Sequence, residues 1–421
     1  MAPTTAPNRT DIAAMVGSAL ESTPIVDLHT HLYPPSFGPL MSWGIDDLLT
    51  YHYLIAELMR VIEPSDPDID GFYAMPKQAQ ADLIWQRLFL DRSPISEACR
   101  GVATTLNKLG LDTQQPDLNA YRAWFAEQTP EAHLERVLEV AGVERVTMTN
   151  DPFDETERKI WLDGVSVDAR FDAVLRIDPL IVDWAGGAVS KLNAWGFDVD
   201  AEASGRSIEQ VQRFLNEWLD RMQAVYVAAS LPPSFAFPSK DPGVRVLTEA
   251  VLPVCAERNL PMAMMIGVDR AIHPALRQAG DMGFTADIRA VTNLCAAHPD
   301  NKFMVTMLSE TNQHELAVAA RKFGNLMVFG CWWFLNNPSL IERISRFRTE
   351  LLGLSYIPQH SDCRVTEQLI YKWDHSLRVL RGVLTDKYAD LAATGWPVDE
   401  AAVGRDVRRL LKDNYLCFLD R

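Results

Sequence analysis

The sequence predicts an α/β protein: a (β/α)₈ TIM-type barrel with a helical insertion after strand 1 and a helical extension at the C-terminus. Eight short apolar runs rich in β-forming residues recur along the chain, and amphipathic segments with helical spacing separate several of them. This alternation is typical of parallel sheets, and eight such units close into a barrel. A barrel needs about 250 residues, so the insertion and the extension account for the rest of the 421 residues.

A doubly wound open sheet is the alternative arrangement of alternating strands and helices. It loses support because no Gly-x-Gly-x-x-Gly pattern follows any of the apolar runs. The polar, proline-containing start predicts a disordered tail over 1–10. We expect 11–421 to form a single barrel domain that includes the helical insertion at about 40–140.

The elements follow in order along the chain. A helix over 11–20 leads into the first strand, and helical apolar periodicity dominates the stretch from 45 to 140. The apolar runs predict strands at 24–31, 144–150, 173–180, 224–231, 261–268, 302–308, 326–334 and 353–360. Helices are predicted between the later strands, at 207–223, 244–258, 285–297, 313–323 and 338–352.

The overall charge narrows the classes of partner. A formal net charge of −16 argues against non-specific nucleic-acid binding, and an anionic substrate requires local arginines to overcome the field. Six scattered cysteines without a Cys-x-x-Cys pair predict free thiols in a reducing compartment. The sequence has no apolar run of signal-peptide or membrane-spanning type, so we expect a cytoplasmic protein that binds no membrane.

Two histidines at the end of the first predicted strand suggest a metal site. His29 and His31 are two residues apart, so in a strand both side chains face the same way, and Asp27 shares that face. Two imidazoles on one face can bind a metal ion if another group completes the shell. The spacing alone is equally compatible with a pair of core or surface histidines.

Barrel closure supplies a candidate for the remaining ligand. Strands 1 and 8 are neighbours in a closed barrel, so Asp362, just after the last predicted strand, would lie beside His29 and His31. Two imidazoles and one carboxylate form an open site for one divalent ion, and zinc is the expected metal. Taken alone, Asp362 also fits a helix-capping or ion-pair role.

Two arginines at strand ends are candidates for binding an anionic substrate. Arg364 lies two residues after Asp362, where it is placed to grip a carboxylate or to keep the aspartate ionised. A surface salt bridge is its structural alternative. Arg176 ends an apolar run, where a cation needs an anionic partner, either a substrate carboxylate or the nearby Asp178.

Four further side chains are candidates for the pocket. His52 and Tyr53 begin the helical insertion and can move protons, although aromatic residues at a helix start usually pack. Trp332 and Trp333 follow the seventh predicted strand, where a flat apolar wall suits a sugar ring and core packing is the alternative.

Taken together, these motifs resemble a known family. The Asp-x-His-x-His run with a strand-eight aspartate resembles the amidohydrolase superfamily of metal-dependent barrels. Within it, the chain is similar to the uronate isomerase (glucuronate isomerase) family, and the similarity extends from about residue 24 to 420. The motifs that carry it are Asp27-Leu28-His29-Thr30-His31, His52-Tyr53, Met59-Arg60, Asn150-Asp151-Pro152, Trp332-Trp333-Phe334 and Ser361-Asp362-Cys363-Arg364.

The resemblance implies the reversible conversion of D-glucuronate to D-fructuronate and of D-galacturonate to D-tagaturonate. This reaction moves a proton from C2 to C1 through a cis-enediol. The resemblance also implies a mononuclear metal site formed by His29, His31 and Asp362. The same comparison places His52, Tyr53, Asp362 and Arg364 in catalysis, and Arg176, Arg364, Trp332 and Trp333 at the substrate.

One departure from the family pattern concerns the metal. Many members have His-Ile-Gly at strand five, where this chain has Met265-Ile266-Gly267, and strand four lacks the lysine of binuclear relatives. Both differences fit a single metal ion and leave its identity and affinity open. The partner expected from the resemblance is a small uronic acid, and assembly into a homo-oligomer stays open.

Two other functions remain alternatives. A metal-dependent hydrolase or decarboxylase on the same barrel would use a metal-bound hydroxide with Asp362 as its base. An inactive sugar-acid-binding protein is the second, and loss of the metal because of Met265 would support it. The pairing of Arg364 with Asp362 and of Tyr53 with His52 favours chemistry on a sugar acid.

Overall fold

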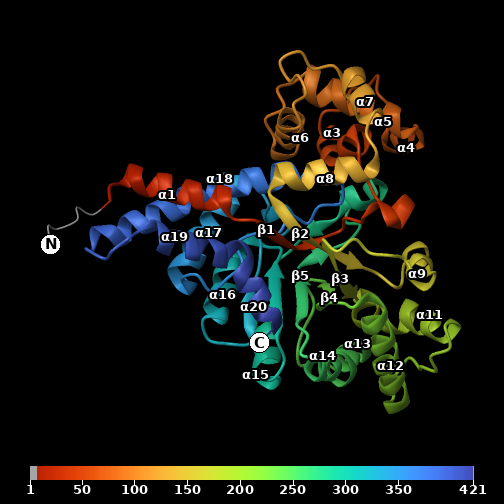
Figure 1. Cartoon of the computed structure of the whole chain (residues 1–421). Helices are drawn as coiled ribbons and strands as arrows, with labels where there is room; N and C mark the ends of the chain where they lie inside the picture. The colour runs from red at the N-terminus through yellow and green to blue at the C-terminus, as the bar shows by residue number, and fades with distance from the viewer. Residues whose placement is uncertain (1–6, 421) are drawn as a thin grey trace.

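The computed structural model describes residues 7–420 and shows a curled parallel sheet surrounded by helices (Figure 1). Seven strands are hydrogen-bonded in the order β1-β2-β3-β4-β5-β8-β9. This arrangement confirms the predicted α/β barrel architecture. The strands are β1 (Ile25–Thr30), β2 (Val143–Asn150), β3 (Phe171–Arg176), β4 (Val227–Leu231), β5 (Met262–Ile266), β8 (Phe303–Met307) and β9 (Leu326–Val328).

The eighth predicted strand, 353–360, does not form a regular ladder. One parallel bridge joins Phe329 to Ile357, and the barrel closes on β1 where the His31 N–H donates to Cys363 O at 2.7 Å. Pro358 lies in the middle of this segment and has no N–H to donate, which is incompatible with a continuous ladder. The segment still fills the place of an eighth strand, because it lies buried between β9 and β1.

Two other predicted strands end early for local reasons. β3 stops at Arg176 because Pro179 starts the short helix α10 (Asp178–Val182). β9 stops at Val328, and Gly330 then turns the chain with a φ of 63°. The part of the predicted seventh strand that follows is a loop and the turn η6 (Trp333–Leu335).

The helical insertion forms a lobe on one side of the barrel, at the top of Figure 1. It follows the turn η1 (Pro35–Leu40) and contains helices throughout, as the periodicity predicts. Its members are α2 (Ile45–Leu49), α3 (His52–Leu58), α4 (Ile69–Ala74), α5 (Lys77–Trp85), η2 (Gln86–Leu90), α6 (Glu97–Lys108), α7 (Leu118–Ala126) and α8 (Pro130–Ala141).

The first helix, α1 (Arg9–Ser22), begins earlier than expected. Asn8 caps it by accepting hydrogen bonds from the N–H groups of Thr10 and Asp11. Of the predicted tail over 1–10, Arg9 and Thr10 are therefore helical, and residues 1–6 lie outside the described part of the chain.

The remaining helices follow the strands along the chain. They are α9 (Glu155–Leu162), η3 (Trp184–Ala188), α11 (Val189–Ala194), α12 (Gly205–Met222), α13 (Pro242–Val246), η4 (Leu247–Val251), α14 (Leu252–Glu257), η5 (Pro274–Gly280), α15 (Arg289–Ala297), α16 (Glu310–Ala320) and α17 (Pro338–Leu352). Helices α12 to α17 lie close to the predicted positions, whereas α9, η3, α11 and η5 were not predicted. The two-residue strands β6 (Val268–Asp269) and β7 (Met282–Gly283) follow β5 and pair antiparallel with each other. The segment between them includes η5.

The C-terminal extension packs under and beside the barrel. It comprises α18 (Gln368–Ala393), α19 (Glu400–Arg408), η7 (Arg409–Asp413) and α20 (Asn414–Asp420). Tyr415 and Phe418 of α20 belong to the same buried cluster as the inward-facing Leu28, Ala228 and Met304. The last helix therefore closes the end of the barrel opposite the carboxyl ends of the strands.

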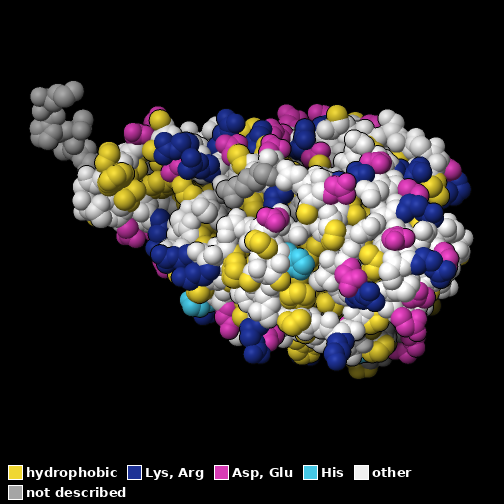
Figure 2. Space-filling model, turned by 90° about the horizontal axis from the view of Figure 1, so that it is seen from below, with side chains coloured by type: hydrophobic (Ala, Val, Ile, Leu, Met, Phe, Trp, Pro, Cys, Tyr) yellow, Lys and Arg dark blue, Asp and Glu magenta, His cyan; other side chains and the backbone are white. Residues whose placement is uncertain are grey.

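One face of the molecule (Figure 2) can be compared with the formal net charge of −16. On the face drawn in Figure 2, acidic and basic side chains alternate with apolar and uncharged ones. None of the helices in the described part of the chain has the length and apolar character needed to cross a membrane.

Candidate active site

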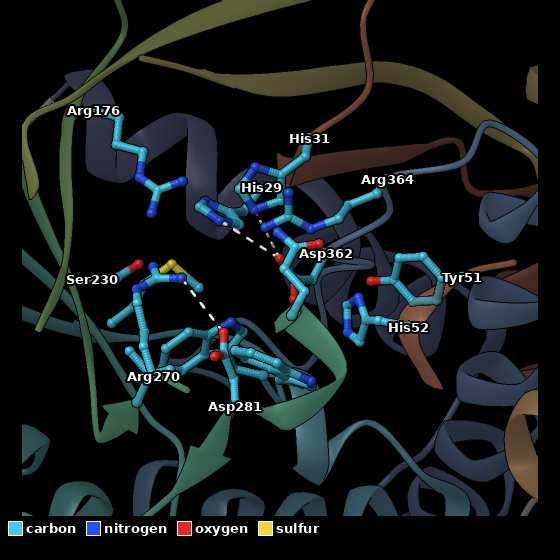
Figure 3. A pocket seen from close by; sticks show the side chains of 15 residues that line it. His29, His31, Tyr51, His52, Arg176, Ser230, Arg270, Asp281, Asp362 and Arg364 are labelled. Carbon is cyan, nitrogen blue, oxygen red and sulfur yellow. Dashed lines mark ion pairs between the residues drawn. The ribbon is translucent and has the colours of Figure 1, made fainter. Parts of the chain in front are cut away.

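A pocket lies where the carboxyl ends of the strands meet, and side chains from several elements converge in it (Figure 3). The structure brings together here all but one of the side chains that the sequence predicts for the site; Tyr53 is the exception. The lining residues are His29, His31, Tyr51, His52, Arg176, Ser230, Met265, Val268, Arg270, Gln278, Asp281, Trp332, Trp333, Asp362 and Arg364.

His29 is held in one orientation by hydrogen bonds to its Nδ1. The Tyr226 hydroxyl lies 3.1 Å from Nδ1 and donates its own proton to Leu28 O at 2.7 Å. Nδ1 of His29 must therefore carry a proton and donate it to Tyr226, which leaves a lone pair on Nε2. Nε2 is buried and has no hydrogen-bond partner among the described residues.

The Asp362 carboxylate faces both histidines. Its Oδ1 lies 3.3 Å from His31 Nε2 and 3.9 Å from His29 Nε2, as Figure 3 shows with dashed lines. Asp362 has a φ of 52°, a left-handed conformation that costs a non-glycine residue energy and is found at functional sites. The Asp362 N–H donates to His29 O at 3.1 Å, which fixes the aspartate against β1.

The three side chains fit a divalent metal ion. Their ligand atoms all lie within 4.8 Å of one another, and Oδ1 of Asp362, like Nε2 of His29, is buried without a hydrogen-bond partner in the described chain. Burial lowers the pKa of His29 to about 3, and burial together with the Arg364 charge lowers the pKa of His31 well below its usual range. Both imidazoles are therefore neutral at pH 7, the form that binds metals.

Asp27 serves a different purpose from the one suggested by its position on the strand. Its carboxylate is fully buried and accepts hydrogen bonds from the Ser361 N–H at 3.2 Å and the Trp373 Nε1–H at 2.8 Å. It does not line the pocket. Asp27 instead ties β1 to the segment that presents Asp362, and it ties both to helix α18.

Three arginines surround the pocket (Figure 3). Arg176 donates to Asp178 Oδ2 at 2.5 Å, the structural partner that the sequence offered. Arg270 lies 3.5 Å from Asp281 in an ion pair. The Arg364 guanidinium makes no hydrogen bond or ion pair with any described residue, although it lines the cavity, so it is free to meet an anion.

The start of helix α3 contributes to the pocket in an unexpected way. His52 lines the cavity with both ring nitrogens buried and unpartnered within the described chain, and burial lowers its pKa to about 3. Tyr53 does not line the cavity, and its hydroxyl is buried. Tyr51, which precedes the helix, occupies the wall instead.

The tryptophans and the strand-five methionine also line the pocket. Trp332 and Trp333 lie in the cavity wall, and Trp333 packs against the His52 ring at 5.5 Å between centroids. Met265 presents its thioether to the cavity. Behind the site, His360 is fully buried beside His29, and Gly330 leaves the room for its ring.

Sequence reasoning did not identify three residues on one segment. Arg270, Gln278 and Asp281 lie between β6 and β7 and reach the pocket from the loop after strand five. Their signal in the sequence is weak, because that stretch has neither strand nor helix periodicity. The available indication was that polar residues, beginning with Asp269 and Arg270, follow the apolar run 261–268, since loops after strands often carry functional residues.

Comparison with known proteins identifies the family. A scan against protein-family models and a search of curated proteins gave no match. A solved uronate isomerase from Bacillus halodurans is 50% identical, with a TM-score of 0.96 over 99% of this chain and 97% of that one.

Two more distant solved structures share the fold. They are a glucuronate isomerase from Caulobacter crescentus (16% identity, TM-score 0.76, 99% and 95% coverage) and a uronate isomerase from Thermotoga maritima (17%, 0.70, 100% of both). Half of the residues are identical to the Bacillus halodurans protein over nearly the whole length of both chains, so this chain belongs to the uronate isomerase family.

Proposed function

We propose that the protein interconverts aldose and ketose forms of hexuronates, D-glucuronate with D-fructuronate and D-galacturonate with D-tagaturonate. Membership of the family supports the reaction class. The observation that carries the proposal is a buried aspartate with an unpaired carboxylate, beside two neutral histidines and in a pocket with an unpaired arginine. This combination suits a small sugar with a carboxylate that must lose and regain a proton.

His29, His31 and Asp362 would hold one divalent ion, with zinc the expected metal because two imidazoles and a carboxylate suit it. When bound, such an ion supplies electrostatic stabilisation for negative charge on a nearby oxygen. Met265 offers only a weak thioether donor, so the site would hold a single ion.

Asp362 would carry the proton in isomerisation. Its Oδ1 faces the histidines, whereas Oδ2 accepts no hydrogen bond within the described chain and is left for the substrate. The carboxylate would remove the proton from C2 and return it to C1, while the electron pair passes through the cis-enediol. Arg364 would stabilise the charge that develops on oxygen, and Arg176 would contact the substrate carboxylate.

The aromatic residues would bind and open the sugar ring. Burial keeps His52 neutral and raises the pKa of Tyr53 well above its usual value, so the phenol keeps its proton. His52 lines the cavity and would exchange a proton with the ring oxygen during opening. Tyr53 does not line the cavity and would assist through His52, whose ring lies 4.6 Å from the Tyr53 ring between centroids. Trp332 and Trp333 would provide an apolar wall for the sugar face.

The reducing cytoplasm is the compartment that we propose for this activity. All six cysteines are free thiols, and five of them are buried. Proteins with unpaired thiols of this kind are typical of reducing compartments.

The test is an assay of the purified protein with D-glucuronate and D-galacturonate, in which ketose formation is measured before and after treatment with a chelator. We expect ketose from at least one hexuronate, and loss of activity with the metal. Hydrolysis of lactones or decarboxylation of aromatic acids without ketose formation would favour the hydrolase alternative. Binding of either uronate without turnover would favour the inactive binding protein.

A further inference from the structure

A second cavity lies directly outside the candidate active site. It is bounded by helices of the insertion on one side and by the segment between β6 and β7 on the other. Four side chains line both cavities: Tyr51, His52, Gln278 and Arg364. We call this second cavity the antechamber, because a ligand that passes these four side chains moves from one cavity into the other.

The antechamber contains a guanidinium held in a fixed place. Arg277 lies over the ring of Tyr73, 4.1 Å from its centroid, which is a cation–π contact. The Tyr73 hydroxyl donates to Leu276 O at 2.7 Å, so the ring is fastened to the segment that carries the arginine. Arg277 has a φ of 53°, a left-handed conformation that a side chain rarely adopts.

The charges of the antechamber leave two cations for a ligand. Lys77 is paired with Asp47 and so is largely neutralised. Arg277 and Arg364 both line the cavity and have no acidic partner among the described residues. In a chain with a formal net charge of −16, an anion needs such local positive charge to approach the pocket.

We infer that the antechamber is a binding subsite for the carboxylate of an incoming sugar acid. Arg277 captures the carboxylate at the outer end, and Arg364, which lines both cavities, receives it at the entrance to the active pocket. Arg277 therefore acts on substrate entry and takes no part in proton transfer. This inference rests on the proposed function, because it takes a hexuronate as the ligand.

The test compares Arg277→Gln with Arg343→Gln in steady-state isomerisation of D-glucuronate over a range of salt concentrations. Arg343 is exposed on α17 and paired with Glu310 at 2.7 Å, so its replacement changes the net charge equally at a site away from the pocket. We expect Arg277→Gln to lower kcat/KM about fivefold, with kcat unchanged, and to flatten its decline with salt. Arg277→Lys keeps the positive charge, so its kcat/KM should again decline with salt concentration as the wild-type value does.

Several results would overturn the inference. One is an Arg277→Gln variant with the kcat/KM and salt dependence of Arg343→Gln. Another is an equal fall in kcat and kcat/KM, which would place Arg277 in the chemical step. If the wild-type protein forms no ketose from either hexuronate, the proposed function itself fails, a result that differs from both.

Discussion

At the scale of single residues, the site depends on orientations that neighbouring groups enforce. The Tyr226 hydroxyl fixes the proton of His29 on Nδ1, and this leaves Nε2 free to face Asp362. Behind the site, Gly330 leaves the space that the His360 ring occupies. A Cβ at this position would lie 1.8 Å from Nδ1 of the buried His360, and its φ of 63° disfavours any side chain.

Gly330→Ala should therefore destabilise the protein. The methyl group must displace His360 and adopt a left-handed conformation, at a combined cost of about 2–4 kcal/mol. Urea unfolding measures this loss. Gly382→Ala is the matched control, because Gly382 lies in α18 with nothing within 4 Å of the added carbon, and it should be neutral or slightly stabilising. Equal stability of the two variants would show that His360 moves without cost.

At the scale of elements, the site forms where the barrel closes. In the described chain, the segment over 353–360 pairs with β9 through one isolated bridge, Phe329 to Ile357. The Asp27 carboxylate adds a further connection, because it accepts hydrogen bonds from the Ser361 N–H and the Trp373 indole N–H. Trp373 belongs to α18, so this buried carboxylate is one of the contacts that join the C-terminal extension to the barrel. Asp362 is the next residue after Ser361, and its position depends on that connection.

Trp373→Phe should weaken the site as well as the fold. It removes one donor from the buried Asp27 carboxylate, which costs about 1–3 kcal/mol of stability. Outer hydrogen bonds to a metal site influence affinity by about 10–100-fold, so we expect weaker metal binding and lower kcat/KM. Metal titration and kinetics measure both effects.

Trp184→Phe provides the control for this change. The Trp184 indole donates to a backbone carbonyl, Asp200 O, at 3.1 Å, and the residue does not line the pocket. We expect a loss of stability without an effect on metal affinity. If the two variants bind metal equally well, the Trp373 hydrogen bond to Asp27 has no influence on the position of Asp362.

At the scale of the whole molecule, buried neutral histidines make stability depend on pH. Burial lowers the pKa of His29, His52 and His360 to about 3, compared with an ordinary value of 6.5. Between these values the unfolded chain binds protons that the folded chain does not, so stability falls as the pH drops below 6.5. Each histidine contributes about 1.4 kcal/mol per pH unit in this window.

His360→Gln isolates one of these contributions. In the metal-free protein, its free energy of unfolding should decline less steeply between pH 6.5 and 5 than that of the wild type. Burial raises the pKa of Asp27 and of Glu157, and those groups change stability in the opposite direction. Comparison of slopes removes their effect. His314→Gln, which removes an exposed imidazole, should leave the slope unchanged, and equal slopes for both variants would refute the prediction.

The sequence predicts the parts of this molecule that follow from periodicity. Strand and helix patterns locate most of the barrel, and closure of a ring then brings Asp362 to His29 and His31 without any nearness in sequence. The inward direction of Tyr51 instead of Tyr53 could not be predicted, because it depends on where α3 begins.

Loop geometry and buried polar partners are the other limits of sequence reasoning. Arg270, Gln278 and Asp281 reach the pocket through a segment without periodicity. Asp27 shares the strand face of the histidines by spacing, but its partners Ser361 and Trp373 come from distant parts of the chain. These contacts are set by tertiary packing, which no local pattern encodes.

The most direct test of proton transfer at Asp362 follows D-glucuronate by NMR in D₂O with the wild-type protein and with Asp362→Asn. Wild type should form the ketose, and over many turnovers deuterium should appear at C1 of the ketose and at C2 of the remaining aldose. Asp362→Asn should fold normally and form no ketose. An Asp362→Asn variant that folds and forms the ketose at a near-normal rate would contradict the account, whereas a wild-type ketose with little deuterium would mean only that the carboxylate returns the proton before it exchanges with solvent.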